Sequence, residues 1–256
     1  MASGEKLQII QNQINQDFPY IQKMKYVGVK YDLIITSIFI SNLTTSCMNP
    51  TSFDSGDFCE QKEVQFLRDN KHVTPDGWYH ILKLQLLYLF RDYLKAENIG
   101  YKSERILSFS YGLIQIQEHY FYFTLTLLKI YENTSLLFER FKLRRKIKKN
   151  IAKLKVWGTA CEENYQHKYL LVLGEYYRSI KKDNISAKRC FEEGIELAKR
   201  YNFNQVIALG YELMWTIDLK YNKYLKEAYY HYMVWGAQTK ATHLKTNYHQ
   251  YFEGAQ

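Results

Sequence analysis

The chain has 256 residues, which is long enough for one large domain or two and for a substantial buried core. Only 3 Pro and 12 Gly stand against 24 Tyr and 14 Phe, and this shortage of turn residues argues against an all-β protein. The first residues are polar, and no apolar run approaches the ~20 residues needed to cross a bilayer. We therefore expect neither a signal peptide nor a membrane span.

The cysteines are widely separated in the sequence, at Cys47, Cys59, Cys161 and Cys190. None of them forms a CxxC pair, so we expect reduced thiols in a cytoplasmic protein. The first four residues, Met-Ala-Ser-Gly, are compatible with a cloning remnant. No linker or low-complexity tract divides the remainder, so residues 1–256 are expected to form one helical-repeat domain.

Apolar residues recur every three to four positions almost from end to end, which predicts about twelve helices. The first two are expected at residues 5–15, ending before Pro19, and at residues 20–41. A loop rich in turn formers follows at 46–56, and then a helix at 57–69. Thr74 and Pro75 match an N-cap followed by proline at the first helical position. The helix that they begin is expected to run to Glu97 and to end before Gly100.

The remaining helices are expected at residues 102–116, 118–131, 135–157, 164–179, 185–201, 204–219, 223–238 and 240–248. Because the connections between them are short, neighbouring helices should form antiparallel hairpins.

A repeated pattern typical of tetratricopeptide hairpins is clearest over residues 164–248. One copy comprises Leu173-Gly174, Tyr177, Ala187 and Phe191, and the other Leu209-Gly210, Leu213, Ala228 and Tyr232. In such repeats small residues let paired helices approach while aromatic residues fill the space between them. The fold class predicted is all-α, a right-handed superhelix of antiparallel hairpins built from degenerate tetratricopeptide-like repeats.

The net charge of +9 is concentrated in one segment. Residues 140–155 hold nine Lys and Arg and no acid, and the rest of the chain carries 26 residues of each sign. Apolar residues at Phe138, Phe141, Ile147, Ile151, Leu154 and Trp157 predict the inner face of one helix. The candidate interaction surface on its other face comprises Arg140, Arg144, Arg145, Lys148, Lys149 and Lys153. A solvated helix face is the competing interpretation, and acidic protein, nucleic acid and anionic lipid remain open as partners.

Catalytic and cofactor motifs are absent from the sequence. It contains no phosphate-binding glycine loop, no HExxH and no Gly-x-Ser-x-Gly elbow. The seven histidines show no paired metal-ligand spacing. We therefore expect no enzyme activity, no cofactor and no metal in this chain.

The C-terminal third carries a family resemblance. The run Ala228-Tyr229-Tyr230-His231-Tyr232-Met233-Val234-Trp235-Gly236-Ala237, followed by Lys240-Ala241, Leu244 and Tyr248, resembles the end of the helical region in hybrid sensor histidine kinases. Those kinases carry a serine/threonine-kinase-like domain, a STAND ATPase, a tetratricopeptide-like region, a GAF domain and a histidine kinase core. The likeness extends upstream through residues 121–128, 167–169 and 189–198. His249 and Lys245 depart from it, since the family usually has Pro and Glu there.

The resemblance implies a non-catalytic module for protein interaction and signal transmission in a two-component phosphorelay. Its partners would be other domains of the parent kinase or a partner protein, contacted through an acidic segment. Ala228, Tyr229, Tyr232, Trp235 and Gly236 would be packing residues. Two alternatives remain open: a free-standing tetratricopeptide-like adaptor and a nucleic-acid-binding protein that uses the basic helix.

Overall fold

The computed structural model describes residues 4–24, 26–45, 49–107, 115–219 and 222–252. In these residues the chain forms twelve α-helices, and the only β-type pairing is an isolated bridge between Ser55 and Phe58. The prediction of an all-α fold with about twelve helices is confirmed.

In chain order the helices are α1 (Leu7–Lys23), α2 (Val27–Thr44), α3 (Glu60–Asp69), α4 (Val73–Leu89), α5 (Tyr93–Leu107), α6 (Ile116–Asn133), α7 (Leu137–Ala160), α8 (His167–Tyr176), α9 (Asn184–Arg200), α10 (Asn204–Trp215), α11 (Lys223–Trp235) and α12 (Gln238–Asn247). Two π-helical turns, η1 (Glu162–Gln166) and η2 (Tyr177–Lys181), flank α8, and a 3-10 turn, η3 (His249–Tyr251), follows α12.

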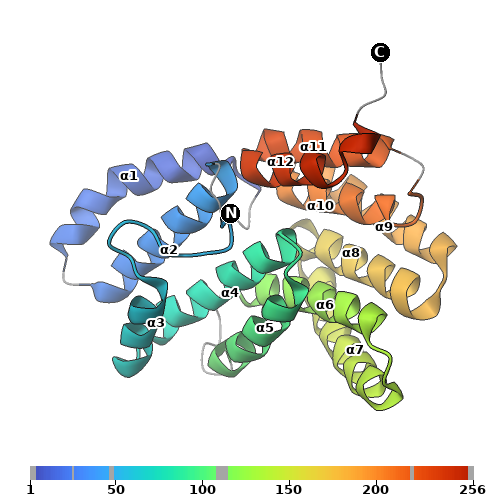
Figure 1. Cartoon of the computed structure of the whole chain (residues 1–256), viewed down its shortest axis with the longest axis horizontal. Coiled ribbons are helices and arrows are strands. Elements are labelled where there is room, and N and C mark those ends of the chain that lie inside the picture. The colour runs from blue at the N-terminus through green and yellow to red at the C-terminus, as the bar shows by residue number, and fades with distance from the viewer. Residues whose placement is uncertain (1–3, 25, 46–48, 108–114, 220–221, 253–256) are drawn as a thin grey trace.

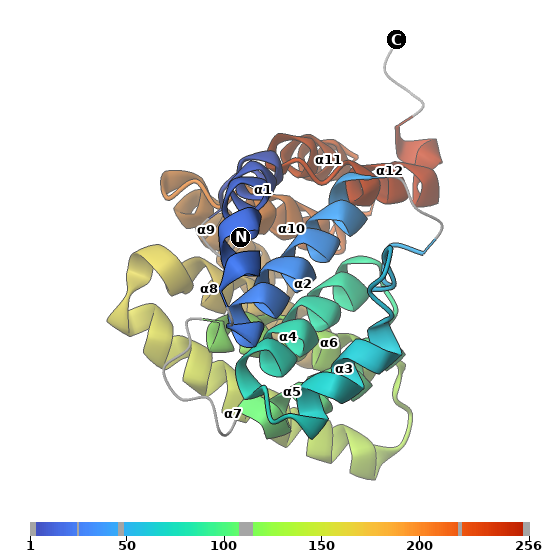
Figure 2. The same cartoon turned by 90° about the vertical axis from the view of Figure 1, so that its left-hand side faces the viewer.

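The two ends of the helix array meet. Apart from α2 and α3, which both pack against α4, consecutive helices pack against each other, and α12 also packs against α2 (Figures 1 and 2). A hydrogen bond of 2.9 Å from the Thr239 hydroxyl to the Thr45 carbonyl ties this contact. The hairpins therefore surround a central region that α4, α6, α10 and α12 all reach.

The predicted packing residues of the C-terminal third lie in or against the hydrophobic core. Ala228 and Tyr232 are fully buried, and Trp235 is 1% exposed. Tyr229 is half-buried and meets Phe252 edge-on, with ring centroids 5.7 Å apart. Gly236 ends α11 at φ 96°, a left-handed conformation that glycine adopts without a Cβ clash. These five residues therefore form and terminate a packed helix.

The α8–α9 hairpin depends on a close approach at Gly174. A Cβ added there would lie 2.6 Å from the ring of Phe191 and 3.1 Å from the Ala187 carbonyl oxygen. The small residue thus lets the aromatic ring insert between the two helices.

The first helix is longer than predicted because it continues through Pro19. Proline lacks the N–H that would bond to the carbonyl four residues earlier, at Asn15. Both residues are exposed, so water can satisfy that carbonyl and the helix continues to Lys23. The predicted break before Pro19 is therefore wrong, and α2 begins at Val27 rather than at Tyr20.

The predicted helix at 74–97 is also wrong, because the chain turns at Arg91. Its φ of 68° is left-handed, and its N–H bonds to the Tyr88 carbonyl at 3.1 Å while the Asp92 N–H bonds to that of Leu87 at 2.9 Å. This is a Schellman C-cap with arginine where glycine is usual. Gly100 does not end a helix; it lies inside α5, where a Cβ would clash with the ring of Phe123.

The expected cap at Thr74 is not formed. α4 begins at Val73 and has no side-chain cap, which places Pro75 within the first turn. The predicted helix at 102–116 is misplaced, because α5 begins at Tyr93 directly after the turn at Arg91 and ends at Leu107. The remaining helices match their predicted ranges to within about four residues, a normal uncertainty for helix boundaries. Residues 46–48 of the predicted loop and 108–114 of the predicted helix at 102–116 lie outside the described residues.

Replacing Trp235 with Ala should lower the free energy of unfolding by about 3–5 kcal/mol, because it removes a fully buried indole from the core. The matched control is Tyr230→Ala on the same helix, where the side chain is 59% exposed and the change should stay within about 0.5 kcal/mol. Urea denaturation of both variants measures the difference. Equal stability of the two would show that Trp235 is not a core residue.

Two buried histidines should make the fold sensitive to acid. Burial, followed by the nearby charges of Lys146 and Lys153, lowers the pKa of His119 to about 3. Burial and then Lys168 lower that of His167 to about 3 as well. Between pH ~6.5 and 3 the unfolded chain binds these protons and the folded chain does not, so stability is present above pH ~6.5 and is lost as pH falls.

At pH 5 each of these histidines should destabilise the fold by roughly 2 kcal/mol relative to pH 7. Urea denaturation at the two pH values should show this loss, and the double variant His119→Leu/His167→Leu should retain more of its pH 7 stability at pH 5. The exposed His249→Gln serves as control and should follow the parent. An unchanged pH profile in the double variant would contradict the assignment.

Candidate functional site

The basic helix predicted from the sequence is α7. Its inner face consists of Leu143, Ile147, Asn150, Leu154 and Gly158, all buried. The spacing of three to four residues along this face is that of one helical stripe, so the opposite side of α7 is left to solvent.

Four of the predicted cations form an open strip on that outer side. Arg144, Arg145, Lys148 and Lys149 are exposed and make no ion pair or hydrogen bond with the side chains of the described residues. Residues three and four positions apart are neighbours on a helix surface, so these like charges repel at close range. Their positive charge is therefore available to a partner.

The other predicted cations of the surface turn onto tyrosines. The Arg140 guanidinium lies 4.4 Å from the ring centroid of Tyr131, and the Lys153 ammonium donates to the Tyr120 hydroxyl at 2.6 Å. In the same segment, Lys146 pairs with Glu104 of α5 at 2.5 Å. Part of the basic charge that the sequence leaves unbalanced is thus neutralised within the fold.

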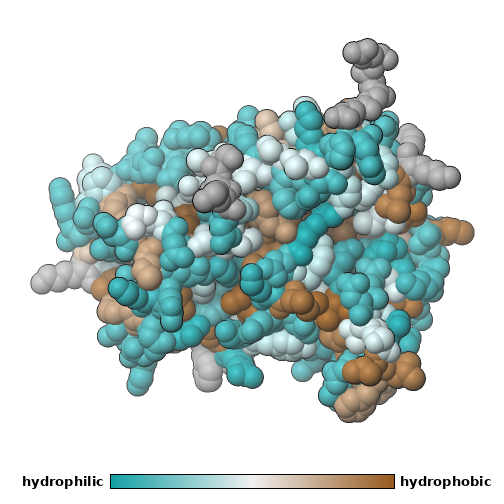
Figure 3. All heavy atoms as spheres, in the orientation of Figure 1, coloured by the Kyte–Doolittle hydropathy of each residue, from teal (hydrophilic) through white to brown (hydrophobic). Residues whose placement is uncertain are grey.

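An apolar tip adjoins the strip at the start of α7. Leu136, Leu137, Phe138 and Phe141 are 69%, 84%, 68% and 65% exposed. Phe138 and Phe141 were expected on the inner face, and that expectation is wrong: Leu143 begins the inner face instead. Brown spheres gather at the end of α7 at the lower right of Figure 3. We call the tip and the four-cation strip together the α7 surface.

A second site, which the sequence did not indicate, is a cavity of about 120 Å³ at the centre of the array. Its lining comes from α4, α5, α6, α10, α12 and the segments between them, and comprises Tyr88, Leu89, Arg91, Tyr93, Lys129, Leu209, Glu212, Leu213, Trp215, Thr216, Lys240 and Tyr248. No local motif connects these positions, because only the tertiary fold brings them together.

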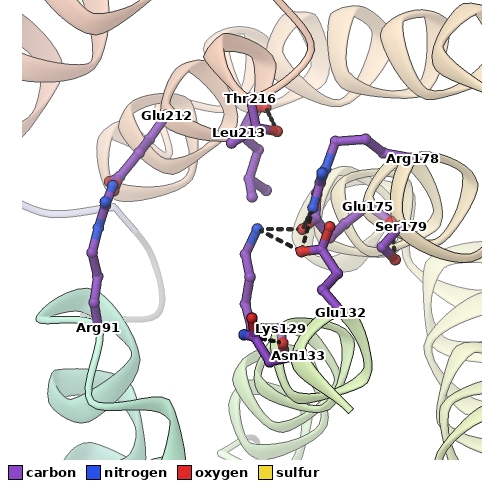
Figure 4. Close-up of polar contacts among 10 residues, drawn as sticks. All are labelled: Arg91, Lys129, Glu132, Asn133, Glu175, Arg178, Ser179, Glu212, Leu213 and Thr216. Atoms are coloured by element: carbon purple, nitrogen blue, oxygen red, sulfur yellow. Dashed lines mark hydrogen bonds and ion pairs between the residues drawn. The ribbon is translucent and has the colours of Figure 1, made fainter. Parts of the chain in front are cut away.

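Glu212 on α10 forms the left wall of this cavity in Figure 4, where Arg91 points up toward it. Its carboxylate accepts hydrogen bonds from the Arg91 guanidinium at 2.7 Å and from the Tyr232 hydroxyl at 2.9 Å. The Lys240 ammonium lies 3.0 Å from it and also donates to the Leu89 carbonyl at 2.7 Å. One carboxylate thus serves two cations.

Lys129 on α6 forms the opposite wall. Its ammonium lies 2.5 Å from Glu175 and 3.7 Å from Glu132. Arg178 donates to both of these carboxylates, at 2.7 Å to Glu175 and 2.6 Å to Glu132. Figure 4 shows Lys129 reaching into the space below Leu213, with Glu175 and Arg178 on its far side.

The charged groups around the cavity keep both deeply buried carboxylates ionised. Burial alone would raise the pKa of Glu212, but Lys240 and Arg91 outweigh it and hold that pKa well below its usual value. Lys129 and Arg178 do the same for Glu175. Burial lowers the pKa of Lys240 despite the attraction of Glu212. The site is therefore a set of fixed charges with little contact with water.

Two other kinds of site have no basis in the described residues. Among them, no three His, Cys, Asp or Glu side chains converge as metal ligands. None of the described helices combines the length and apolar character required to cross a bilayer.

Comparison of the chain with protein-family models, with curated proteins and with solved structures finds no match.

Removing the charge of Glu212 should destabilise the fold strongly. Glu212→Gln leaves the buried Lys240 and the half-buried Arg91 without a counter-charge, which should cost about 3–5 kcal/mol of unfolding free energy. The control is Glu196→Gln, which breaks an exposed pair with Lys199 and should cost less than about 1 kcal/mol. Thermal and urea melts compare the two; similar losses would show that Glu212 is not a central support.

Proposed function

We propose that this chain is a non-catalytic protein-interaction module that docks an acidic, partly apolar segment of another domain or protein on the α7 surface. The observation that carries the proposal is the continuity of Arg144, Arg145, Lys148 and Lys149 with the exposed tip at residues 136–141. A partner that matches both parts would need acidic residues alongside one or two large apolar side chains.

The two parts of the surface contribute in different ways. Burying one exposed Leu or Phe against a partner stabilises a complex by roughly 1.5–3 kcal/mol. Exposed cations add less to affinity but speed association and fix orientation. The apolar tip would therefore determine how long the partner stays, and the basic strip how quickly and in which orientation it arrives.

The biological setting of the proposal is the helical region of a hybrid sensor histidine kinase. The likeness of residues 228–248 to the end of that region supports it. In this setting the hairpins are degenerate tetratricopeptide-like repeats, an interpretation supported by Gly174 against Phe191 and by Gly210 against Ile195. The module would transmit a signal between domains of the parent kinase; a free-standing adaptor could use the same α7 surface.

Binding of a synthetic peptide that alternates Glu and Phe to the 256-residue chain tests the proposal. Calorimetry at ~50 and ~150 mM salt should show affinity that falls as salt rises, because salt screens exposed charges. The charge-reversal set Arg144→Glu, Arg145→Glu, Lys148→Glu and Lys149→Glu should weaken binding at least tenfold. The matched set Lys62→Glu, Lys181→Glu, Lys188→Glu and Arg189→Glu makes the same change in net charge on other exposed positions and should bind like the parent.

A third variant separates the apolar contribution. The triple variant Leu137→Ser/Phe138→Ser/Phe141→Ser should lower the affinity for the peptide. The salt dependence of binding should stay unchanged, because the cations remain. Equal effects of the two charge-reversal sets would contradict the proposal. So would tighter binding, at ~150 mM salt, of an oligonucleotide or of vesicles containing anionic lipid, which would make phosphate the preferred ligand of the strip.

A further inference from the structure

We propose that the central cavity is a binding site for a compact oxyanion, a carboxylate or phosphate group on a small molecule. The cavity is independent of the α7 surface, and it is built mainly from charged and aromatic side chains. Of its twelve lining residues, Arg91, Lys129 and Lys240 are cations and only Glu212 is an acid.

The charge balance around the cavity is positive. On the α6 side, Lys129 and Arg178 face Glu132 and Glu175, so two cations meet two carboxylates. On the α10 side, Arg91 and Lys240 share Glu212. One cation is therefore in excess in a largely buried region, where an unbalanced charge is unfavourable. An anion in the cavity would balance it.

Unused donor capacity is present on the cavity wall. Arg91 lines the cavity as a second cation, and its guanidinium donates to Glu212 and to Tyr248. Lys129 carries three N–H groups and has one carboxylate at hydrogen-bond distance, on Glu175. Tyr88 and Tyr93 also line the cavity. An oxyanion accepts hydrogen bonds from several directions, which suits donors on facing walls.

The backbone at Arg91 sets the direction of its side chain. A left-handed non-glycine residue costs roughly 1–2 kcal/mol, and glycine would avoid that cost at this C-cap. The strained conformation directs the guanidinium toward Glu212 at the cavity wall (Figure 4).

The size of the cavity limits the ligand. A volume of about 120 Å³ is enough for a few water molecules. Pockets for drug-sized ligands have volumes of ~300–1,000 Å³, so a nucleotide would not fit. The ligand is therefore a small acid or inorganic phosphate. Because its donors belong to α6 and to the turn between α4 and α5, binding should hold these elements together and raise the melting temperature.

Calorimetry and thermal melts of the 256-residue chain with sodium phosphate and with sodium acetate test the proposal, using sodium chloride at equal ionic strength as reference. Both titrations use the α7 charge-reversal set as background, so that binding to surface cations does not contribute. The larger shift of the two identifies whether phosphate or carboxylate is the preferred group.

Two variants address the cavity in different ways. Lys129→Met removes a donor but leaves Glu175 paired with Arg178, and Thr216→Leu narrows the partly exposed side of the cavity without changing any charge. Each should weaken the preferred anion at least tenfold. Lys188→Met, an exposed lysine on α9, is the control and should leave binding unchanged.

Absence of heat and of a melting shift for both anions up to roughly 50 mM, where a millimolar site would be filled, overturns the proposal. Equal affinity in the parent, Lys129→Met and Thr216→Leu overturns it too. If Lys129→Met fails to fold, Thr216→Leu decides alone. Neither result bears on docking at the α7 surface, because the background lacks that surface's charge.

Discussion

The carboxylate of Glu212 is the interaction on which the closed arrangement of helices depends. It lies on α10 and contacts Arg91 from the α4–α5 turn, Tyr232 from α11 and Lys240 from α12. These segments are far apart in the sequence, so one buried group sets the position of the C-terminal helices against the N-terminal half. Charges of this kind contribute less to net stability than apolar packing does, since desolvation offsets their attraction. They also disfavour other arrangements, because separating Glu212 from Arg91 and Lys240 would leave a buried carboxylate without a counter-charge.

Most helices could be predicted because an apolar stripe of period 3.6 is a local signal. The ends of the helices were harder to predict. Left-handed conformations at or near helix ends are adopted by Lys71, Arg91, Lys182 and Asn202. Glycine, the usual residue in this conformation, would have indicated the turn in the sequence. The open cations of α7 could be found from their spacing alone. Phe138 and Phe141 were misplaced because an apolar period does not reveal where the neighbouring helices stop covering it. The central cavity could not be found, since only tertiary contacts bring its charged residues together.

The last turns of α6 contact both the central cavity and the start of α7. Lys129 faces the cavity, and Tyr131, two residues later, lies under the guanidinium of Arg140. Helical geometry places these two side chains on different sides of the same helix. A shift of this end of α6 would therefore change the geometry of both the cavity and the start of α7. This contiguity is a physical requirement for coupling, although coupling itself needs two alternative positions of the helix that each ligand favours differently.

The exposed tip of α7 has a consequence for the colloidal behaviour of the protein. Leu137 and Phe138 on one molecule could bury their surface against the same residues on another, but the neighbouring cations hold two such molecules apart by repulsion. Salt shortens the range of that repulsion and leaves the apolar attraction in place. An ionic strength that weakens binding of an acidic partner thus also favours association of two molecules through their apolar tips. The same few side chains therefore govern both solubility and partner binding. Both properties are most favourable at low ionic strength.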